Sequence, residues 1–444
     1  MLRDKAFLNP FIKIVLPIAL QYLFISSLGI VDTIMVGQMG AAAIASVSLA
    51  TQVFFLLNFT LFGIQTGAAI FTAQYWGNQD IPGIRRVLGV SLTIGLTACA
   101  LFSVLALGFP TQAVGFYTQD PQVITLGSEY LRIVGFSYIA TTITACYTSA
   151  LRSVGHIRMP VLVGILTLCL NTALNYLLIF GHLGLPRLGV LGAAVATSTA
   201  RVLECAALLL YVYLSRSPLA ASLKELTRID RRFWGVYLGV AAPVVANEVL
   251  WSVGTSLYNA VYAHIGTEQL AAVSVAITIL NLASVIFNGI STACGIMVGN
   301  AIGAGQPEKA YLVAKRSLIL GGGLALVVGT GLFLARFAAI DLFQLSAATR
   351  QYAYDVLGVL SFAVIFRAFN PTIIVGTLRS GGDVRYSALL DVGAVWLVGV
   401  PLAFLGGYVL HLPIHWVVVC ALGEGLSKSI IGRRNWFRFI PLAA

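Results

Sequence analysis

The sequence is poor in charged residues. Asp, Glu, Lys and Arg make up 10% of its 444 residues, whereas about 25% is usual for a soluble domain. Signatures of the common catalytic sites are also absent. There is no GxxxxGKS or GxxxxGKT loop to bind ATP phosphates, and His411 and His415 lack the glutamate of an HExxH zinc motif. These absences argue against an enzyme, including an integral membrane enzyme, and they predict no metal cofactor.

The six cysteines include no CxxC pair, and all of them lie within apolar runs. Neither disulfides nor a zinc site is therefore expected. The net charge of +11 raises the alternative of a nucleic-acid-binding protein, but such proteins gather basic residues on one face beside groove-reading motifs. Here the basic residues lie in short segments between apolar runs. We therefore expect a lipid bilayer around the protein and no nucleic-acid partner.

Long apolar runs dominate the sequence, and hydrophobic residues make up 59% of it. A run of about 20 apolar residues is long enough to cross a bilayer as a helix. Twelve such runs occur, near residues 11–36, 44–73, 87–109, 126–150, 159–181, 189–214, 234–262, 270–299, 313–334, 352–377, 386–409 and 413–431. The sequence therefore predicts an all-α integral membrane protein with twelve transmembrane helices.

The positions of the basic residues predict how the chain crosses the membrane. Most of the 27 lysines and arginines fall in alternate segments between the predicted spans, and in membrane proteins the excess of positive charge marks the cytoplasmic segments. This pattern assigns Arg379 and Lys428 to the cytoplasmic side. It places both termini in the cytoplasm and predicts a multi-pass protein of the cell inner membrane.

A polar segment near the middle of the chain divides it. Residues 215–232 form the longest polar stretch, and we interpret them as a cytoplasmic linker with a short surface helix. The linker would join an N-terminal lobe of six helices, residues 1–214, to a C-terminal lobe of six helices, residues 233–444.

The two predicted lobes are related by an internal repeat. With an offset of 226 residues, Pro17 aligns with Pro243, and with an offset of 227 residues LRSVGHIR in the first lobe resembles LRSGGDVR in the second. Because each lobe has an even number of spans, both enter the membrane in the same direction. This predicts a pseudo-twofold axis along the membrane normal, as in some secondary transporters. A proline inside an apolar helix loosens its hydrogen bonding, so we interpret Pro17 and Pro243 as hinges, with ordinary kinks as the alternative.

Among the carboxylates inside predicted spans, Asp32, Glu248 and Asp391 are the candidates for function. An ionisable residue at membrane depth is costly and is by default a functional hypothesis. Neither Glu248 nor Asp391 has a nearby basic residue in sequence, so cation binding and a protonated carboxyl group bonded to a neighbouring helix both stay open. Asp383 differs, because Arg379 lies near it in a turn, which favours a loop salt bridge over ion binding.

Two asparagines, Asn171 and Asn175, stand one helical turn apart in the fifth span, so both amides project from one face. Hydrogen bonding between helices is one explanation. A cation site is the other, because hard cations take oxygen ligands and the Thr197 hydroxyl in the sixth span could add one. Arg367, in the tenth span, has no local partner in the sequence.

Several segments together resemble the multidrug and toxic compound extrusion (MATE) antiporters, most closely the prokaryotic members. They cover nearly the whole chain and are PIALQYLFISSLGIVDTIMVG, GIQTGAAIFTAQYWGNQD, ALRSVGHIRMP, LNTALNYLLIFG, LGVLGAAVATS, TLRSGGDVR and LLDVGAVWLVGVPLAFLG. The resemblance implies a secondary antiporter that expels organic cations and other amphipathic drugs in exchange for H⁺ or Na⁺, without a cofactor. We expect it to act as a monomer. A flippase of a lipid-linked saccharide, from a related branch of the superfamily, is the alternative.

The resemblance also implies a cation site in the N-terminal lobe. Asp32, Asn171 and Thr197 match the pattern of that site, whereas Asn175 stands where the family has a second acid. This departure removes one negative charge, which favours H⁺ modestly over Na⁺ as the coupling ion.

A second site of the family uses an acid in the seventh helix and one just after the tenth. Glu248 matches the first of these acids, and Asp383 matches the second. Asp391 is a more deeply placed candidate for the same role. The resemblance thus implies that these three carboxylates bind or couple the cation in the C-terminal lobe.

Overall fold

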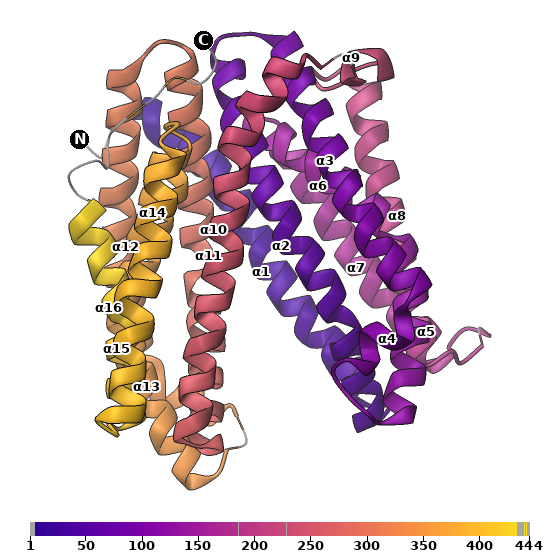
Figure 1. Cartoon of the computed structure of the whole chain (residues 1–444), viewed down its shortest axis with the longest axis vertical. Coiled ribbons are helices and arrows are strands. Elements are labelled where there is room, and N and C mark those ends of the chain that lie inside the picture. Colours follow the sequence, from indigo (N-terminus) through magenta and orange to yellow (C-terminus); the bar gives the residue numbers. More distant parts are fainter. Residues whose placement is uncertain are drawn as a thin grey trace. The chain divides into compact units, whose positions relative to one another are not determined.

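The computed structural model describes residues 5–184, 186–227, 229–343, 345–432, 439 and 441, and within these ranges the chain forms helices and no β-strand. Five arginines that the charge pattern assigns to the cytoplasm lie outside the described residues: Arg3, Arg228, Arg433, Arg434 and Arg438. The helical elements (Figure 1) are α1 (Lys5–Gly37), α2 (Ala41–Gly77), α3 (Ile81–Gly108), α4 (Pro110–Gly115), α5 (Pro121–Phe136), α6 (Tyr138–Ser153), α7 (Arg158–Phe180), α8 (Val190–Leu214), α9 (Leu223–Thr227), α10 (Arg231–Ile265), α11 (Thr267–Gly303), α12 (Pro307–Asp341), α13 (Ala347–Pro371), η1 (Thr372–Arg379), α14 (Val384–Ala394), η2 (Val395–Gly399), α15 (Val400–Phe404), η3 (Leu405–Val409) and α16 (Ile414–Gly432).

Among the residues that the structure describes, eleven helices are long and apolar enough to cross a membrane. The predicted fourth span, near residues 126–150, appears as the pair α5 and α6, each of 16 residues. Ser137 separates the two helices but keeps helical backbone angles, with φ −77° and ψ −9°, so together they supply the remaining span. Within the described residues, the twelve-helix prediction is therefore confirmed.

The chain divides into two compact units. The N-terminal unit consists of Leu20–Val245, and the C-terminal unit consists of Met1–Ala19 together with Ala246–Ala444. Both boundaries fall inside helices, α1 and α10, two residues after Pro17 and Pro243. The units therefore differ from the predicted lobes, which begin and end at the linker. Packing assigns the start of α1 to the C-terminal unit and the start of α10 to the N-terminal unit.

Two glycines at equivalent positions of the repeat explain this packing. In the N-terminal unit, a Cβ atom at Gly63 would lie 2.9 Å from the Cα atom of Val245 in α10. In the C-terminal unit, a Cβ atom at Gly289 would lie 2.8 Å from the backbone oxygen of Val15 in α1. Small residues let apolar helices approach closely, and this close contact stabilises helix pairs in membranes. The glycines thus fix the start of each crossing helix in its unit.

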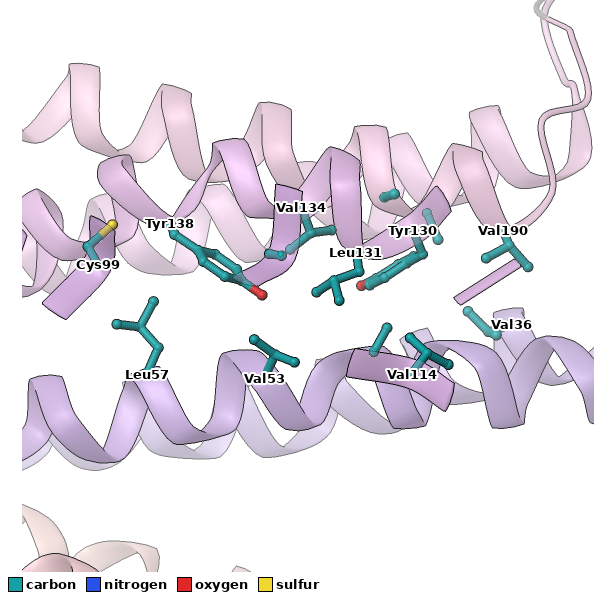
Figure 2. Close-up of a cluster of buried hydrophobic side chains, with 14 of the residues drawn as sticks. Val36, Val53, Leu57, Cys99, Val114, Tyr130, Leu131, Val134, Tyr138 and Val190 are labelled. Carbon is teal, nitrogen blue, oxygen red and sulfur yellow. The ribbon is translucent and has the colours of Figure 1, made fainter. Parts of the chain in front are cut away.

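The interior of the N-terminal unit is a cluster of buried apolar side chains between α2 and the helices around it. Figure 2 shows Leu57 and Val53 facing Tyr138 and Leu131, all of them at most 4% exposed. The two tyrosines of this cluster, Tyr130 and Tyr138, bring their hydroxyl groups into the same layer (Figure 2). The cluster therefore places polar atoms beside an otherwise apolar interior.

The predicted linker is docked on the N-terminal unit. It contains the short helix α9, and Leu219, Ala221 and Leu226 are buried in one cluster with residues of α3, α6 and α8. The guanidinium group of Arg85 on α3 donates to the Pro218 carbonyl at 3.0 Å and to the Glu225 carboxylate at 2.5 Å. The segment from Leu219 to Leu226 is thus a fixed part of this unit.

Candidate functional site

The N-terminal unit brings together the four residues that the sequence singled out. Asp32 lies on α1, Asn171 and Asn175 on α7, and Thr197 on α8. Asn175 donates from Nδ2 to Asp32 Oδ1 at 3.0 Å. In the amide orientation that satisfies both of its ends, Asn171 donates to Asp32 Oδ2 at 3.1 Å and accepts from the Thr197 N–H at 3.3 Å. Each oxygen of the carboxylate therefore receives one amide N–H.

An unpaired oxygen marks this site. Asn175 is 2% exposed, yet its Oδ1 atom has no hydrogen-bond partner among the described residues. A buried polar atom without a partner costs free energy, about 1–3 kcal/mol, and each such atom in a native structure calls for an explanation. An oxygen left open beside a carboxylate fits a site for a monovalent cation, or for the proton of a protonated Asp32.

Aromatic and basic side chains lie near Thr197. The Tyr130 hydroxyl interacts with the side chains of Thr197 and Thr51. Arg201 lies over the Phe54 ring, with its guanidinium carbon 3.7 Å from the ring centroid. Arg201 also interacts electrostatically with Glu204 on its own helix, so it has both an acidic neighbour and a cation–π contact from another helix.

The C-terminal unit contains a buried network of charges. Arg379 Nη1 lies 2.8 Å from Glu248 Oε1, and its Nη2 lies 3.8 Å from Asp391 Oδ2. The Lys428 ammonium lies 2.8 Å from Asp391 Oδ1 and 3.5 Å from Glu424 Oε1. Glu248 and Asp391 are therefore brought close together, as predicted, but through basic side chains.

Polar neighbours complete the network. Asn247 donates from Nδ2 to Asp391 Oδ2 at 2.9 Å, and the Tyr258 hydroxyl donates to Glu424 Oε2 at 2.6 Å. Arg367, which the sequence left without a partner, interacts electrostatically with Glu424. Buried charges are tolerated when they are paired and hydrogen-bonded, and this network meets both conditions.

Arg379 and Lys428, which the charge pattern assigns to the cytoplasmic side, are buried. Their exposed fractions are 1% and 4%, so both lie inside the C-terminal unit, and the side of the membrane to which they belong stays a prediction. Arg379 reaches the interior because helix α13 continues past Pro371 as the π-helix η1 (Thr372–Arg379). A proline lacks the N–H that an α-helix requires, and the wider π-turn is often found at functional sites. Arg379 thus becomes the last residue of a membrane helix.

Glu248 and Asp391 have no nearby basic residue in sequence, and their basic partners Arg379 and Lys428 come from other parts of the chain. A signal was present: Glu424 and Lys428 are four residues apart in the last predicted span, which places them on one helix face. An ion pair inside an apolar helix is itself an intramembrane functional signal.

Asp383 has a local role in this structure. It is 7% exposed, and its Oδ1 atom accepts a hydrogen bond from the Tyr386 N–H at 3.4 Å, which caps the start of α14. Of the two arginines that flank Asp383, Arg379 binds Glu248, and the loop salt bridge of Asp383 stays a prediction. A part for Asp383 in cation binding stays a prediction.

Known proteins resemble this chain over most of its length. The family described as MatE matches it twice, over residues 17–177 and 243–405. "Probable multidrug resistance protein NorM" of Rhizobium meliloti (strain 1021) is 32% identical over 387 residues, 83% of this chain and 80% of that protein. "Probable multidrug resistance protein YoeA" of Bacillus subtilis (strain 168) is 24% identical over 408 residues, with 90% and 87% covered. A crystal structure of MATE in complex with MaL6 superposes with a TM-score of 0.88 at 19% identity over 96% of both chains, which supports the same fold.

Proposed function

The chain belongs to the MatE family of membrane transporters, and from this premise we propose that it is a secondary active antiporter. It exports small organic cations and other amphipathic compounds in exchange for H⁺ or Na⁺. The names of its relatives, which are multidrug resistance proteins, support this class of substrate. The protein spans the cell inner membrane with both termini in the cytoplasm, and it transports as a monomer.

One observation carries the coupling part of this proposal: each carboxylate oxygen of Asp32 accepts a hydrogen bond from one amide N–H. Protonation turns one of these oxygens from an acceptor into a donor. The new O–H group needs an acceptor, and turning the facing amide to present its own oxygen rearranges the hydrogen bonds between α1 and α7. A coupling ion shifts a conformational equilibrium only if it interacts differently with the two states, and this rearrangement supplies such a difference.

The number of charges at the site favours H⁺. A proton neutralises the Asp32 carboxylate without a complete shell of oxygen ligands. The open Oδ1 atom of Asn175 is the observation that favours Na⁺, because it adds an oxygen ligand beside the carboxylate. Pro17 lies on the same helix as Asp32, and we propose that it and Pro243 are the hinges of the movement that follows ion exchange.

Transport in reconstituted vesicles tests the proposal. Vesicles loaded with a fluorescent cationic dye are given a proton gradient, a sodium gradient or neither. Dye movement against its own gradient, driven by either ion gradient alone, is the expected result. Dye movement that depends on neither gradient contradicts an antiporter, and movement of a lipid-linked saccharide in place of dye supports the flippase alternative.

A further inference from the structure

We propose that the C-terminal unit contains a tethered cation: the ammonium group of Lys428 permanently fills a cation position between Asp391 and Glu424. The two units would then differ in how they hold their cation. The N-terminal unit holds an exchangeable ion at Asp32, whereas the C-terminal unit holds its cation by a covalent link to α16. This inference concerns ion binding within the C-terminal unit and goes beyond the proposed transport activity.

The geometry around Lys428 is that of a bound cation. Its Nζ atom lies 2.8 Å from Asp391 Oδ1 and 3.5 Å from Glu424 Oε1, so two carboxylates from two helices face one positive charge. Lys428 is 4% exposed and Asp391 is 8% exposed. The positive charge is thus enclosed with its counter-ions and is not a surface lysine that happens to be near an acid.

The second carboxylate oxygen of Asp391 and that of Glu424 are already occupied. Asp391 Oδ2 accepts from Asn247 and faces Arg379, and Glu424 Oε2 accepts from the Tyr258 hydroxyl. These contacts leave the position of Nζ as the place where both acids share a cation. A free Na⁺ could bind there only by displacing the lysine ammonium.

Charge balance points to the same conclusion. The carboxylates of Glu248, Asp391 and Glu424 face the cations of Arg379 and Lys428, and Arg367 interacts with Glu424. A further cation would give this buried network an excess of positive charge, which is unfavourable in a low-dielectric interior. The native network therefore has no need of a free ion.

Each unit contains a hydrogen-bonded pair of one asparagine and one aspartate. Asn175 donates to Asp32 at 3.0 Å, and Asn247 donates to Asp391 at 2.9 Å. In both asparagines the Oδ1 atom is buried without a partner among the described residues. Each unit thus has an asparagine–aspartate pair with one open oxygen, and only the pair in the C-terminal unit contacts an ammonium group.

Binding of radioactive Na⁺ to the purified protein tests this inference. All variants carry Asp32→Asn, which removes the carboxylate of the N-terminal unit. This parent should bind no Na⁺ in the C-terminal unit. Adding Lys428→Ala removes the ammonium group and leaves space, so saturable Na⁺ binding should appear, with a rise in Tm of about 2 °C in NaCl relative to choline chloride of equal ionic strength.

Two controls make the result specific. Adding Asp391→Asn to the Lys428→Ala variant should abolish the new Na⁺ binding, because it removes a ligand. Replacing the exposed Lys224 of α9 by Ala in the parent should create no Na⁺ binding. The inference is wrong if Lys428→Ala binds no Na⁺, or if the parent with Lys428 intact already binds Na⁺ in a manner that Asp391→Asn abolishes.

A second measurement covers the case in which Lys428→Ala does not fold. The double variant Lys428→Met/Asp391→Asn removes one charge of each sign, and it should have a higher Tm than Lys428→Met alone. A double variant no more stable than Lys428→Met would show that Lys428 is not the counter-ion of Asp391. These assays measure binding and stability, so a failure of the proposed antiport would leave their outcomes unchanged.

Discussion

Asn175 donates a hydrogen bond to Asp32 at 3.0 Å, although the two residues are 143 positions apart in the sequence. This bond joins α7 to the part of α1 that lies in the N-terminal unit, after Pro17. A change in the charge of Asp32 therefore alters a contact between two membrane helices. It does so on the same helix that passes from one compact unit to the other, although Asp32 lies twelve residues beyond Leu20, where the N-terminal unit begins.

The first prediction concerns Asp32→Asn. This variant keeps the size of the side chain but has no charge to exchange, so gradient-driven dye export should be lost. Expression and elution as a folded protein in detergent should be unchanged, because the site retains hydrogen-bonding groups. The exposed Asp355 offers a matched control, since Asp355→Asn should export normally. Export at the normal rate by Asp32→Asn would place the coupling ion elsewhere.

The second prediction concerns Asn175→Asp, which adds a second carboxylate beside Asp32. Two carboxylates that share a site repel each other unless a cation lies between them, and oxygen ligands suit Na⁺. The variant should therefore gain dependence on a sodium gradient relative to the native protein. Measuring export under separate sodium and proton gradients checks this. An unchanged preference between the ions would show that the charge at position 175 does not select them.

The sequence predicted the members of the N-terminal site because their spacing is a local property. Asn171 and Asn175 are one turn apart on any α-helix, and Asp32 is the acid of an apolar run. Their mutual distances were beyond the sequence alone, and the resemblance to a family supplied the grouping. The twelve spans followed from the length of the apolar runs, with the helix break at Ser137 as an unpredicted detail.

The C-terminal network was predicted only in part, for two physical reasons. The rule that relates charge to topology uses only the position of Lys and Arg near span ends, so it could not show that Arg379 and Lys428 are buried. It has no means of recognising the π-helix after Pro371, which carries Arg379 inside the unit. Glu248 also seemed isolated because its partner is 131 residues away. Long-range pairing of buried charges is a tertiary property.

The third prediction concerns the ion pair between Glu248 and Arg379. Arg379 is buried, with its side chain 2% exposed, and Glu248 is partly buried, with its side chain 12% exposed, so Glu248→Gln leaves a poorly compensated guanidinium group. Losing one partner of a buried ion pair costs about 3–5 kcal/mol, and Glu248→Gln should lower the free energy of unfolding accordingly. Thermal unfolding in detergent measures the loss.

A double variant separates stability from ion binding in this case. Glu248→Gln/Arg379→Met removes both charges and should recover part of the lost stability, since no unpaired charge is left. If Glu248→Gln keeps its stability but loses affinity for substrate, Glu248 binds substrate or ion directly. The ion pair would then have no structural role.

The last prediction concerns the docked linker, where Ser222 and Glu225 form a capping box at the start of α9. Glu225 Oε2 accepts from the backbone N–H and the hydroxyl of Ser222 at 2.7 Å and 2.9 Å. These bonds, and then the bond from Arg85, hold the pKa of Glu225 below its ordinary value of 4.5. They favour the charged form of the carboxylate.

The direction of the shift fixes the pH dependence of linker docking. A carboxyl group whose pKa is lower in the docked state contributes stability that is complete above its ordinary pKa and is lost as the pH falls through the lowered value. A spin label on Lys224→Cys, with the exposed Cys169 replaced by Ser, should be immobile at pH values above the ordinary pKa of 4.5 and become mobile only as the pH falls through the lowered pKa of Glu225. Adding Glu225→Gln should remove this transition, whereas Glu308→Gln, at an exposed site on α12, should leave it in place. A transition that persists in Glu225→Gln would mean that another group controls the docking of the linker.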